Sequence, residues 1–442
     1  MAFEIIMPKA GIDMTEGQIV KWLKKEGDPV KEGEIILEIM TDKTSMELEA
    51  EATGILLKIV HQDGETVPVT EVIGYIGSEN ESVETLMPEV IEDTGAKESD
   101  EEKRMIRLED NYQVVVIGGG PAGYVAAIRA AQLGAKVAIV EKGTFGGTCL
   151  NVGCIPTKTY LKNAEIIEHI QAAASRGIII DSTMIRIDME KVQEYKNGVV
   201  KKLTSGVVSL LKSNGVDIYQ GVGRINKNHD VVVNDSQIIK ADKIILAGGS
   251  KASRINIPGI ESKKVLTSDE LLAVKEVPGT LAVIGGGVIG TEMGQSFAGL
   301  GSKVIIIEMM DRIVPTLDQE VSAELLRHMK KKGIEVMTST RITEIVDKGD
   351  KLEIRIEGKD PVIADKALIA IGRTPDLEGL GEVKPEIERG KIKVNEYMET
   401  SVKGIYAPGD VNGIKMLAHV AFRMGEVAAE NAVKGNHRKV KL

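Results

Sequence analysis

Cys149 and Cys154 are the only cysteines of this chain, and they stand in the segment GGTCLNVGCIPTK, residues 146–158. Their spacing fits neither the C-x2-C motif of thioredoxins nor a zinc site, and no second Cys/His pair completes a set of metal ligands. Gly153 permits a backbone bend that could bring the two Cα atoms within the roughly 4.4–6.8 Å that a disulfide requires. Structural disulfides are rare in cytosolic proteins. The pair is therefore either a redox-active disulfide or two unrelated buried thiols.

Two glycine-rich motifs follow predicted strands and open predicted helices. In each, the order strand, G-x-G-x-x-G, helix, strand and acidic residue is typical of a dinucleotide site, where glycines let the backbone approach a pyrophosphate and the acid accepts hydrogen bonds from ribose. A carboxylate at the end of the second motif repels a 2′-phosphate, which favours NAD over NADP. The candidate residues are Gly118, Gly120, Gly123 and Glu141 in the first motif, and Gly285, Gly287, Gly290 and Glu308 in the second.

The rest of the sequence predicts three kinds of region that position these motifs. Residues 1–78 contain short β-rich runs broken by Gly and Asp turns, which predicts a small all-β flattened barrel or sandwich. Residues 79–110 hold 12 acidic and four basic residues and predict a flexible linker. From residue 112 onward a β-α-β pattern occurs twice, with helices over 122–133 and 288–300. The fold class is therefore α/β, with two Rossmann-like dinucleotide-binding domains behind a small β-domain.

Composition and charge exclude several other functions. The chain has 442 residues, 43% of them hydrophobic, and a net charge of −10. No apolar run reaches the 18 or so residues of a membrane span, and no basic face for nucleic acid is expected. The N-terminus has no basic region ahead of an apolar core, so a cytoplasmic location is expected.

The segment from Cys149 to Lys158 closely resembles the redox motif of the pyridine nucleotide-disulfide oxidoreductases, and of the dihydrolipoyl dehydrogenases in particular. The resemblance covers about 111 to 442. Residues 247–250 resemble the crossing between the FAD and NAD domains, although the family more often has Thr at the position of Gly248. Residues 404–410 resemble the second FAD motif, and residues 417–419 the backbone near the flavin pyrimidine. The resemblance implies an FAD-binding domain of two parts, 111–270 and 373–442, around an NAD-binding domain, 271–372.

The resemblance also implies roles for single residues. Cys149 is the interchange thiol that a dithiol substrate attacks, and Cys154 lies beside the flavin as a thiolate, which requires a lowered pKa. Lys158 lies near flavin N5 and is paired with Glu292 of the second motif's helix. The residues expected to bind FAD are Gly118, Gly120, Gly123, Glu141, Lys158, Gly248, Asp410 and Ala418.

The N-terminal unit carries a second resemblance, in the segment from Glu38 to Ala50. It resembles the lipoyl domain of 2-oxo acid and acetoin dehydrogenase complexes, with Lys43 at a hairpin tip as the lipoylation site. Biotinyl domains share the fold but place Met on both sides of the lysine, whereas Asp42 and Thr44 stand here. A lipoyl arm is a dithiol carrier, so it is a candidate substrate for the cysteine pair of its own chain or of a neighbour.

The chain also departs from the family. Family members continue into an interface domain, which builds the homodimer and supplies a His-Glu pair as acid/base, whereas this sequence stops at Leu442. The interface domain is therefore expected to be absent, and turnover of dihydrolipoamide impaired. Two alternatives remain: a mercuric or glutathione reductase of the same superfamily, and a non-catalytic carrier or scaffold. The favoured hypothesis is oxidation of protein-bound dihydrolipoyl groups with reduction of NAD+.

Overall fold

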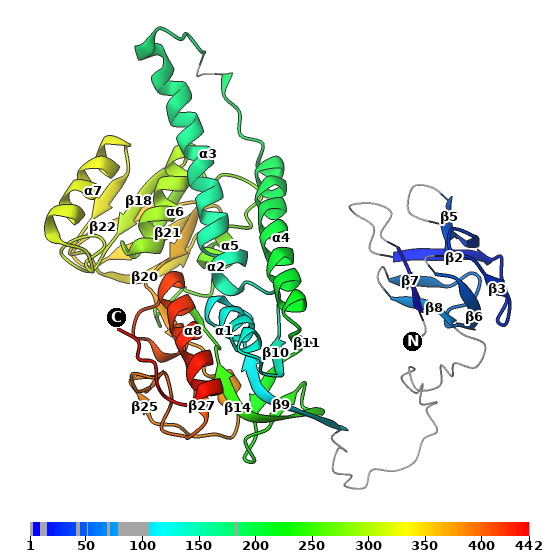
Figure 1. The fold of residues 1–442 in the computed structure, drawn as a ribbon. Coiled ribbons are helices and arrows are strands. Elements are labelled where there is room, and N and C mark those ends of the chain that lie inside the picture. Colours follow the sequence, from blue (N-terminus) through cyan, green and yellow to red (C-terminus); the bar gives the residue numbers. More distant parts are fainter. Residues whose placement is uncertain are drawn as a thin grey trace, which may run out of the picture. The chain divides into compact units, whose positions relative to one another are not determined.

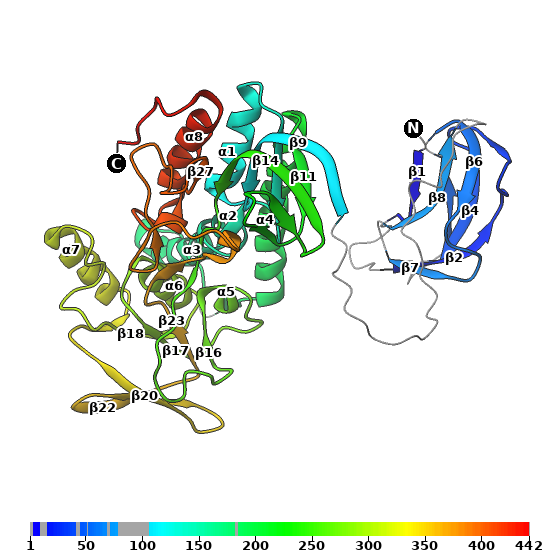
Figure 2. The same cartoon turned by 90° about the horizontal axis from the view of Figure 1, so that it is seen from below.

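The structure, a computed structural model, describes residues 3–8, 16–40, 45–50, 52–68, 71–77, 106–181 and 184–441. The chain forms two compact units, Met1–Asp100 and Glu101–Leu442. The described part of the first unit is built of strands, and the second unit combines sheets with helices (Figures 1 and 2). Within the described ranges, no helix has the length and apolar content that a membrane span needs.

The N-terminal unit is a sandwich of two antiparallel sheets around one core. Their strand orders are β1-β8-β6-β3 and β5-β4-β2-β7. Side chains that alternate along the strands point inward, and Ile19, Leu37 and Leu56 are fully buried between the sheets. The strands are β1 (Phe3–Ile6), β2 (Glu16–Trp22), β3 (Pro29–Val30), β4 (Ile35–Met40), β5 (Ser45–Glu49), β6 (Gly54–Ile59), β7 (Thr66–Pro68) and β8 (Val72–Gly77).

Strands β4 and β5 form an antiparallel hairpin in which Met40 lies opposite Ser45. The residues that join the two strands, 41–44, include Lys43 and lie outside the described residues. The structure therefore describes both strands of the hairpin that was expected to carry the lipoylation site, and not the lysine itself.

The first sheet of the C-terminal unit leads into the first glycine motif. Its order is β11-β10-β9-β14-β13-β12, with β27 beside β14. Helices α1, α4 and α8 pack on one face through an alanine-rich core, and α1 and α8 lie side by side (Figure 1). The elements are β9 (Ile106–Ile117), α1 (Pro121–Gln132), β10 (Val137–Glu141), α4 (Met189–Ser213), β11 (Asp217–Gln220), β12 (Gly223–Ile225), β13 (Val231–Val233), β14 (Gln237–Leu246), β27 (Ile405–Tyr406) and α8 (Ala418–Lys434).

The second sheet leads into the second glycine motif and is entirely parallel, in the order β16-β23-β17-β18-β19. Helices α3, α5, α6 and α7 pack on one face, and an antiparallel sheet, β20-β21-β22, packs on the other. The elements are α3 (Cys154–Ala172), β16 (Val265–Leu266), α5 (Ser268–Leu271), β17 (Thr280–Ile284), α6 (Val288–Gly299), β18 (Lys303–Ile307), α7 (Gln319–Lys331), β19 (Glu335–Met337), β20 (Ile342–Asp347), β21 (Leu352–Ile356), β22 (Lys359–Ala364) and β23 (Lys366–Ile369). The predicted α/β class with two Rossmann-like sheets is confirmed.

Short elements complete the unit and link its sheets. Strands β15 and β24 pair with each other where the chain crosses between the two sheets. These remaining elements are α2 (Gly147–Asn151), η1 (Ala173–Arg176), β15 (Ser250–Ala252), β24 (Arg373–Pro375), η3 (Glu378–Leu380), β25 (Ile387–Glu388), β26 (Lys391–Ile392) and η4 (Asp410–Asn412).

Helices α3 and α6 pack closely against each other. The rings of Tyr160 and Phe297 lie 5.7 Å apart. A Cβ atom added at Gly299 would lie 2.3 Å from the Cβ of Ala164. Because real Cβ atoms do not approach so closely, the glycine permits a helix contact that any other residue would push apart.

Two boundaries differ from those expected. Strand β9 begins at Ile106 and pairs with β14, so residues 106–110 belong to a strand and not to the linker. The acidic composition of the segment gives no signal of a backbone pairing with a strand more than a hundred residues away. Strand β16, at 265–266, belongs to the second sheet, although the range 111–270 had been assigned to the FAD-binding domain. Its two residues are too few to show a pattern in the sequence.

Candidate active site

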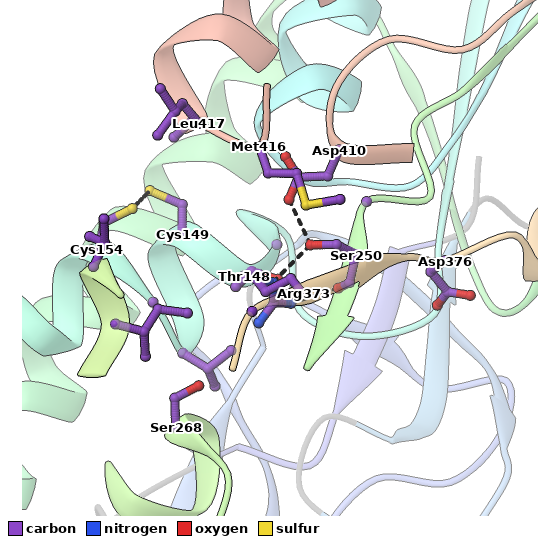
Figure 3. Close-up of a pocket in the computed structure, with 18 of the residues that line it drawn as sticks. Thr148, Cys149, Cys154, Ser250, Ser268, Arg373, Asp376, Asp410, Met416 and Leu417 are labelled. Atoms are coloured by element: carbon purple, nitrogen blue, oxygen red, sulfur yellow. Dashed lines mark hydrogen bonds between the residues drawn. The ribbon is translucent and has the colours of Figure 1, made fainter. Parts of the chain in front are cut away.

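Both glycine motifs and both cysteines line one cavity of about 1490 Å³ in the C-terminal unit. The motifs reach it because each follows the carboxyl end of a parallel strand, β9 or β17, where ligands bind in open α/β sheets. Figure 3 shows part of the wall, with Cys149 and Cys154 on one side and Ser250, Arg373 and Asp410 on the other.

The first glycine of each motif makes the turn out of its strand. Gly118 and Gly285 have φ angles of +103° and +106°, in the left-handed region that favours glycine. A Cβ atom would lie 2.3 Å from the carbonyl oxygen of Ala247 at Gly118, and 2.4 Å from that of Ala370 at Gly285. These positions therefore require glycine for both conformation and space.

The third glycine of each motif packs the helix against the strand. A Cβ atom at Gly123 would lie 1.7 Å from the Gly118 oxygen, and one at Gly290 would lie 2.0 Å from the Gly285 oxygen. Neither Gly123 nor Gly290 lines the cavity. Both are buried within the first turn of their own helix, where they let the helix pack closely on the strand. Their expected place among the cofactor-binding residues stays a prediction.

The acidic residue of each motif is held by backbone amides. One oxygen of Glu141 accepts a hydrogen bond from Gly119 N at 2.5 Å, and the other accepts from the amide two residues after the glutamate at 2.7 Å. Glu308 repeats this arrangement with Gly286 N at 2.5 Å and with the amide two residues on at 2.8 Å. Both carboxylates are thereby fixed at the cavity wall, and their expected contact with ribose stays a prediction.

The two cysteines lie in contact. Cys149 belongs to the short helix α2, Cys154 is the first residue of α3, and their sulfur atoms are 2.7 Å apart as half-buried thiols. Gly153 makes this approach possible, since a Cβ atom there would lie 2.8 Å from the carbonyl oxygen of Thr148. The bend that the sequence placed at Gly153 is present.

The surroundings of the pair favour a thiolate on Cys154. Its pKa is lowered from 9.0 to about 6, first because it accepts a hydrogen bond from the Cys149 thiol, and further because of the positive charge of Lys158 and its own backbone amide. Burial and the charge of Glu292 act in the opposite direction. The pKa of Cys149 is raised, because its thiol donates that hydrogen bond and is partly buried. The proton therefore resides on Cys149 and the negative charge on Cys154.

The expected pairing of Lys158 with Glu292 stays a prediction. Both residues line the cavity, but none of the ion pairs between described residues joins them. Lys158 is exposed, and a solvated lysine gains less than about 1 kcal/mol from such a contact. Instead, the two charges act on Cys154 in opposite directions.

Arg373 was missed by the sequence analysis. Its guanidinium donates hydrogen bonds to the hydroxyl of Ser250 and to that of Thr148, and the Ser250 hydroxyl donates to Asp410 (Figure 3). Asp410 lines the cavity, as do Gly248 and Ala418. The partners of Arg373 stand 123 and 225 residues away along the chain, so no local pattern could have revealed them.

The residues around the cavity fit two dinucleotides. The volume exceeds the roughly 300–1,000 Å³ of an ordinary small-molecule site. Helices α1 and α6 begin after Gly120 and Gly287, and no described side chain caps either one. Gly120 and Gly287 both line the cavity, so the amides of each first turn are available to a phosphate.

Comparisons with known proteins agree with this geometry. Residues 112–425 match the family model described as pyridine nucleotide-disulphide oxidoreductase, and residues 3–76 match the one described as biotin-requiring enzyme. The chain therefore belongs to the pyridine nucleotide-disulphide oxidoreductase family. The cofactors of this family are FAD and NAD, and the N-terminal unit is a carrier domain of the lipoyl type.

Curated relatives narrow the group within the family. The dihydrolipoyl dehydrogenase of Acholeplasma laidlawii is 44% identical over 338 residues, which covers 75% of this chain and 99% of the relative. The dihydrolipoyl dehydrogenase of Thermus scotoductus is 42% identical over 335 residues, which covers 74% of this chain and 71% of the relative. One from Bacillus subtilis is 41% identical over 343 residues, covering 72% and 71%. The chain is thus an enzyme of the dihydrolipoyl dehydrogenase type.

Solved structures show the same fold. The HOCl-induced flavoprotein disulfide reductase RclA from Escherichia coli has a TM-score of 0.65 and 29% identity, covering 74% of this chain and 72% of that one. Its Cu(II) complex matches with the same TM-score at 28% identity.

Proposed function

We propose that this chain oxidises protein-bound dihydrolipoyl groups and passes the electrons to NAD+. The observation that carries the proposal is the contact of Cys149 with Cys154 in a cavity that both dinucleotide motifs also line. A dithiol/disulfide pair and two dinucleotide sites in one cavity are what an enzyme needs to transfer two electrons between a dithiol and a nicotinamide.

The thiol steps follow from the charges on the pair. With Cys149 and Cys154 joined as a disulfide, one substrate thiolate attacks the Cys149 sulfur, the S–S bond breaks, and Cys154 leaves as the thiolate that its low pKa favours. The second substrate thiolate then attacks the substrate sulfur bound to Cys149. The substrate leaves as a cyclic disulfide, and its two electrons remain on the cysteine pair.

The chain's other residues hold the cofactors. We assign the FAD site to Gly118, Gly120, Glu141 and Asp410, and the NAD site to the second motif with Glu308. When bound, FAD supplies the two-electron relay between thiols and nicotinamide. Lys158 stabilises negative charge beside Cys154. The fixed carboxylate of Glu308 favours NAD over NADP because it repels a 2′-phosphate.

The N-terminal unit supports the choice of substrate. Its strands β4 and β5 pair on either side of residues 41–44 in the sequence, which include Lys43, and we propose that this lysine carries the lipoyl group. The substrate is then the arm of its own chain, of a neighbouring chain, or of the acyltransferase core of a 2-oxo acid or acetoin dehydrogenase complex. Tethering raises the effective concentration of such an arm to the millimolar range.

Stopped-flow spectroscopy of the FAD-loaded chain tests the proposal. Anaerobic mixing with dihydrolipoamide is expected to produce a long-wavelength absorbance band from the Cys154 thiolate next to the flavin, and the variant C154S is expected to lose it. In C149S, where Cys154 cannot form a disulfide, the band should be present before mixing and should not increase on mixing. A Lys43→Arg variant should react with free dihydrolipoamide like the parent chain, since only its own arm is removed. If flavin-loaded protein gives no band, the chain is a carrier or scaffold and the proposal is wrong.

A further inference from the structure

Arg373 connects three segments that carry residues of the site. Its Nε donates to the hydroxyl of Ser250 at 2.8 Å, and its Nη2 donates to the carbonyl of Ser250 at 2.6 Å and to the hydroxyl of Thr148 at 3.2 Å. The Ser250 hydroxyl in turn donates to Oδ2 of Asp410 at 2.6 Å. Figure 3 shows these side chains meeting at the cavity wall.

The direction of the hydrogen bonds is determined by the guanidinium. Arginine has only donors, so the Ser250 oxygen accepts from Arg373 and its single proton is left for Asp410. No ion pair between described residues places a carboxylate on Arg373. Arg373 is therefore linked to Asp410 through the Ser250 hydroxyl, whose proton bonds one oxygen of that carboxylate.

The hydrogen bond from Arg373 to Thr148 holds the turn that carries Cys149. Thr148 directly precedes Cys149, and helix α2 has five residues, none of them buried and none capped by a side chain. The Asn151 amide donates to the carbonyls of Thr144, Phe145 and Gly147, and Leu150 packs against the alanine-rich core. Arg373 adds a contact at Thr148, next to the cysteine. The fork geometry of arginine lets one group hold Ser250 and Thr148 together.

We infer that Arg373 is a positioning residue for the thiol chemistry: through Thr148 it holds Cys149 against Cys154, and through Ser250 it holds Asp410 at the opposite wall. The inference rests on the proposed function, since it assigns these two positions to the thiol pair and to the FAD site. It adds a residue that no local motif contains and that touches neither sulfur.

Three substitutions separate the hydrogen bond to Thr148 from the link to Asp410. Thr148→Val removes the hydroxyl that accepts from Arg373 next to Cys149. Ser250→Ala removes the hydroxyl that links Arg373 to Asp410. Arg373→Lys keeps the charge but cannot make the forked contacts. The charged and titratable groups that face the cysteine pair stay in place in every variant: Lys158 from α3, Glu292 from α6 and Tyr124 from α1.

The first measurement follows ionisation of Cys154 by the pH dependence of the thiolate–flavin absorbance band in the reduced chain saturated with FAD. A Cys149 that is held less firmly donates a weaker hydrogen bond, so the midpoint should rise by roughly one pH unit in T148V and in R373K. The double variant should shift no further than R373K alone, because both changes act through one contact. T148S retains the hydroxyl and should titrate like the parent chain.

The second measurement is the dissociation constant of FAD. We expect it to rise about tenfold in S250A and in R373K, and to stay within twofold in T148V. Arg355→Lys is the matched control, since Arg355 on β21 is an exposed arginine with carboxylate partners, away from the cavity. Arg355→Lys should change neither the ionisation midpoint of Cys154 nor the dissociation constant of FAD.

The outcomes distinguish the inference from the proposed function. If the parent chain binds FAD but gives no thiolate–flavin band with dihydrolipoamide, the proposed function fails. If the band forms while R373K and T148V titrate at the parent pH, Arg373 does not position Cys149. A shift in R355K as large as that in R373K would also overturn the inference, because it would show a general loss of structure.

Discussion

Removing the Cys149 thiol should change the ionisation of Cys154 by an amount that the structure allows one to calculate. The pKa of Cys154 is about 6, and the hydrogen bond from Cys149 is the largest cause of its decrease from 9.0. A hydrogen bond to a charged group contributes about 1.5–3 kcal/mol, and one pKa unit corresponds to about 1.36 kcal/mol. Cys149→Ala should therefore raise the pKa of Cys154 to about 7–8.

The consequence at neutral pH is large enough to measure. A thiol of pKa 6 is about nine-tenths ionised at pH 7, whereas one of pKa 7–8 is between roughly half and one-tenth ionised. Because the thiolate is the reactive form, the alkylation rate at pH 7 should decrease by about two- to tenfold. In both the parent chain and C149A, the alkylation rate should fall as the pH decreases through the pKa of Cys154. This fall should occur at a higher pH in C149A than in the parent chain.

Cys149→Ser is the matched control, since it also leaves Cys154 as the single cysteine but retains a hydroxyl donor. Alkylation rates are measured by mass spectrometry over a range of pH. C149S should titrate below C149A. Equal midpoints in C149S and C149A would refute the reasoning, because the hydrogen bond would then not be the cause of the low pKa.

Three further predictions follow from contacts described above. Gly153→Ala places a Cβ atom 2.8 Å from the Thr148 oxygen and should abolish the thiolate–flavin band, whereas Gly198→Ala, in open space on α4, should leave the band intact and raise the melting temperature slightly. Burial alone would raise the pKa of Glu430, but hydrogen bonds from two arginines lower it below 4.5. Glu430→Gln should therefore lower the free energy of unfolding by about 3 kcal/mol at pH 7. Calorimetry should show that the stability difference between parent and variant becomes smaller as the pH falls below about 4.5, because Glu430 is then protonated in the folded parent at its lowered pKa. Glu308→Gln should narrow the preference for NADH over NADPH about tenfold in the KM ratio, and an unchanged ratio would contradict the role of that carboxylate.

The parts of the site that could be predicted were those encoded by neighbouring residues. Gly118 and Gly285 were recognisable because a strand, a tight turn and a helix follow one another within a few positions. The bend at Gly153 was recognisable for the same reason, since both cysteines lie within five residues of each other.

The rest depends on contacts between distant segments. Arg373 reaches Thr148 across 225 positions, and the side chain gives no sign of its partner in the sequence. The same holds for the start of β9, whose first residues have an acidic, linker-like composition but pair with β14. The pairing of Lys158 with Glu292 was expected only from a resemblance and stays a prediction, since Lys158 is exposed in this structure.

Gly299 limits how the two dinucleotide-binding halves can be exchanged between related enzymes. Its contact with Ala164 joins α6 of one half to α3, the helix that begins at Cys154. A chimera that brought in a second half with a larger residue at position 299 would push α3 outward, and the cysteine at its start would move with it. Alanine at 164 and glycine at 299 would therefore have to be inherited together, although 135 positions separate them.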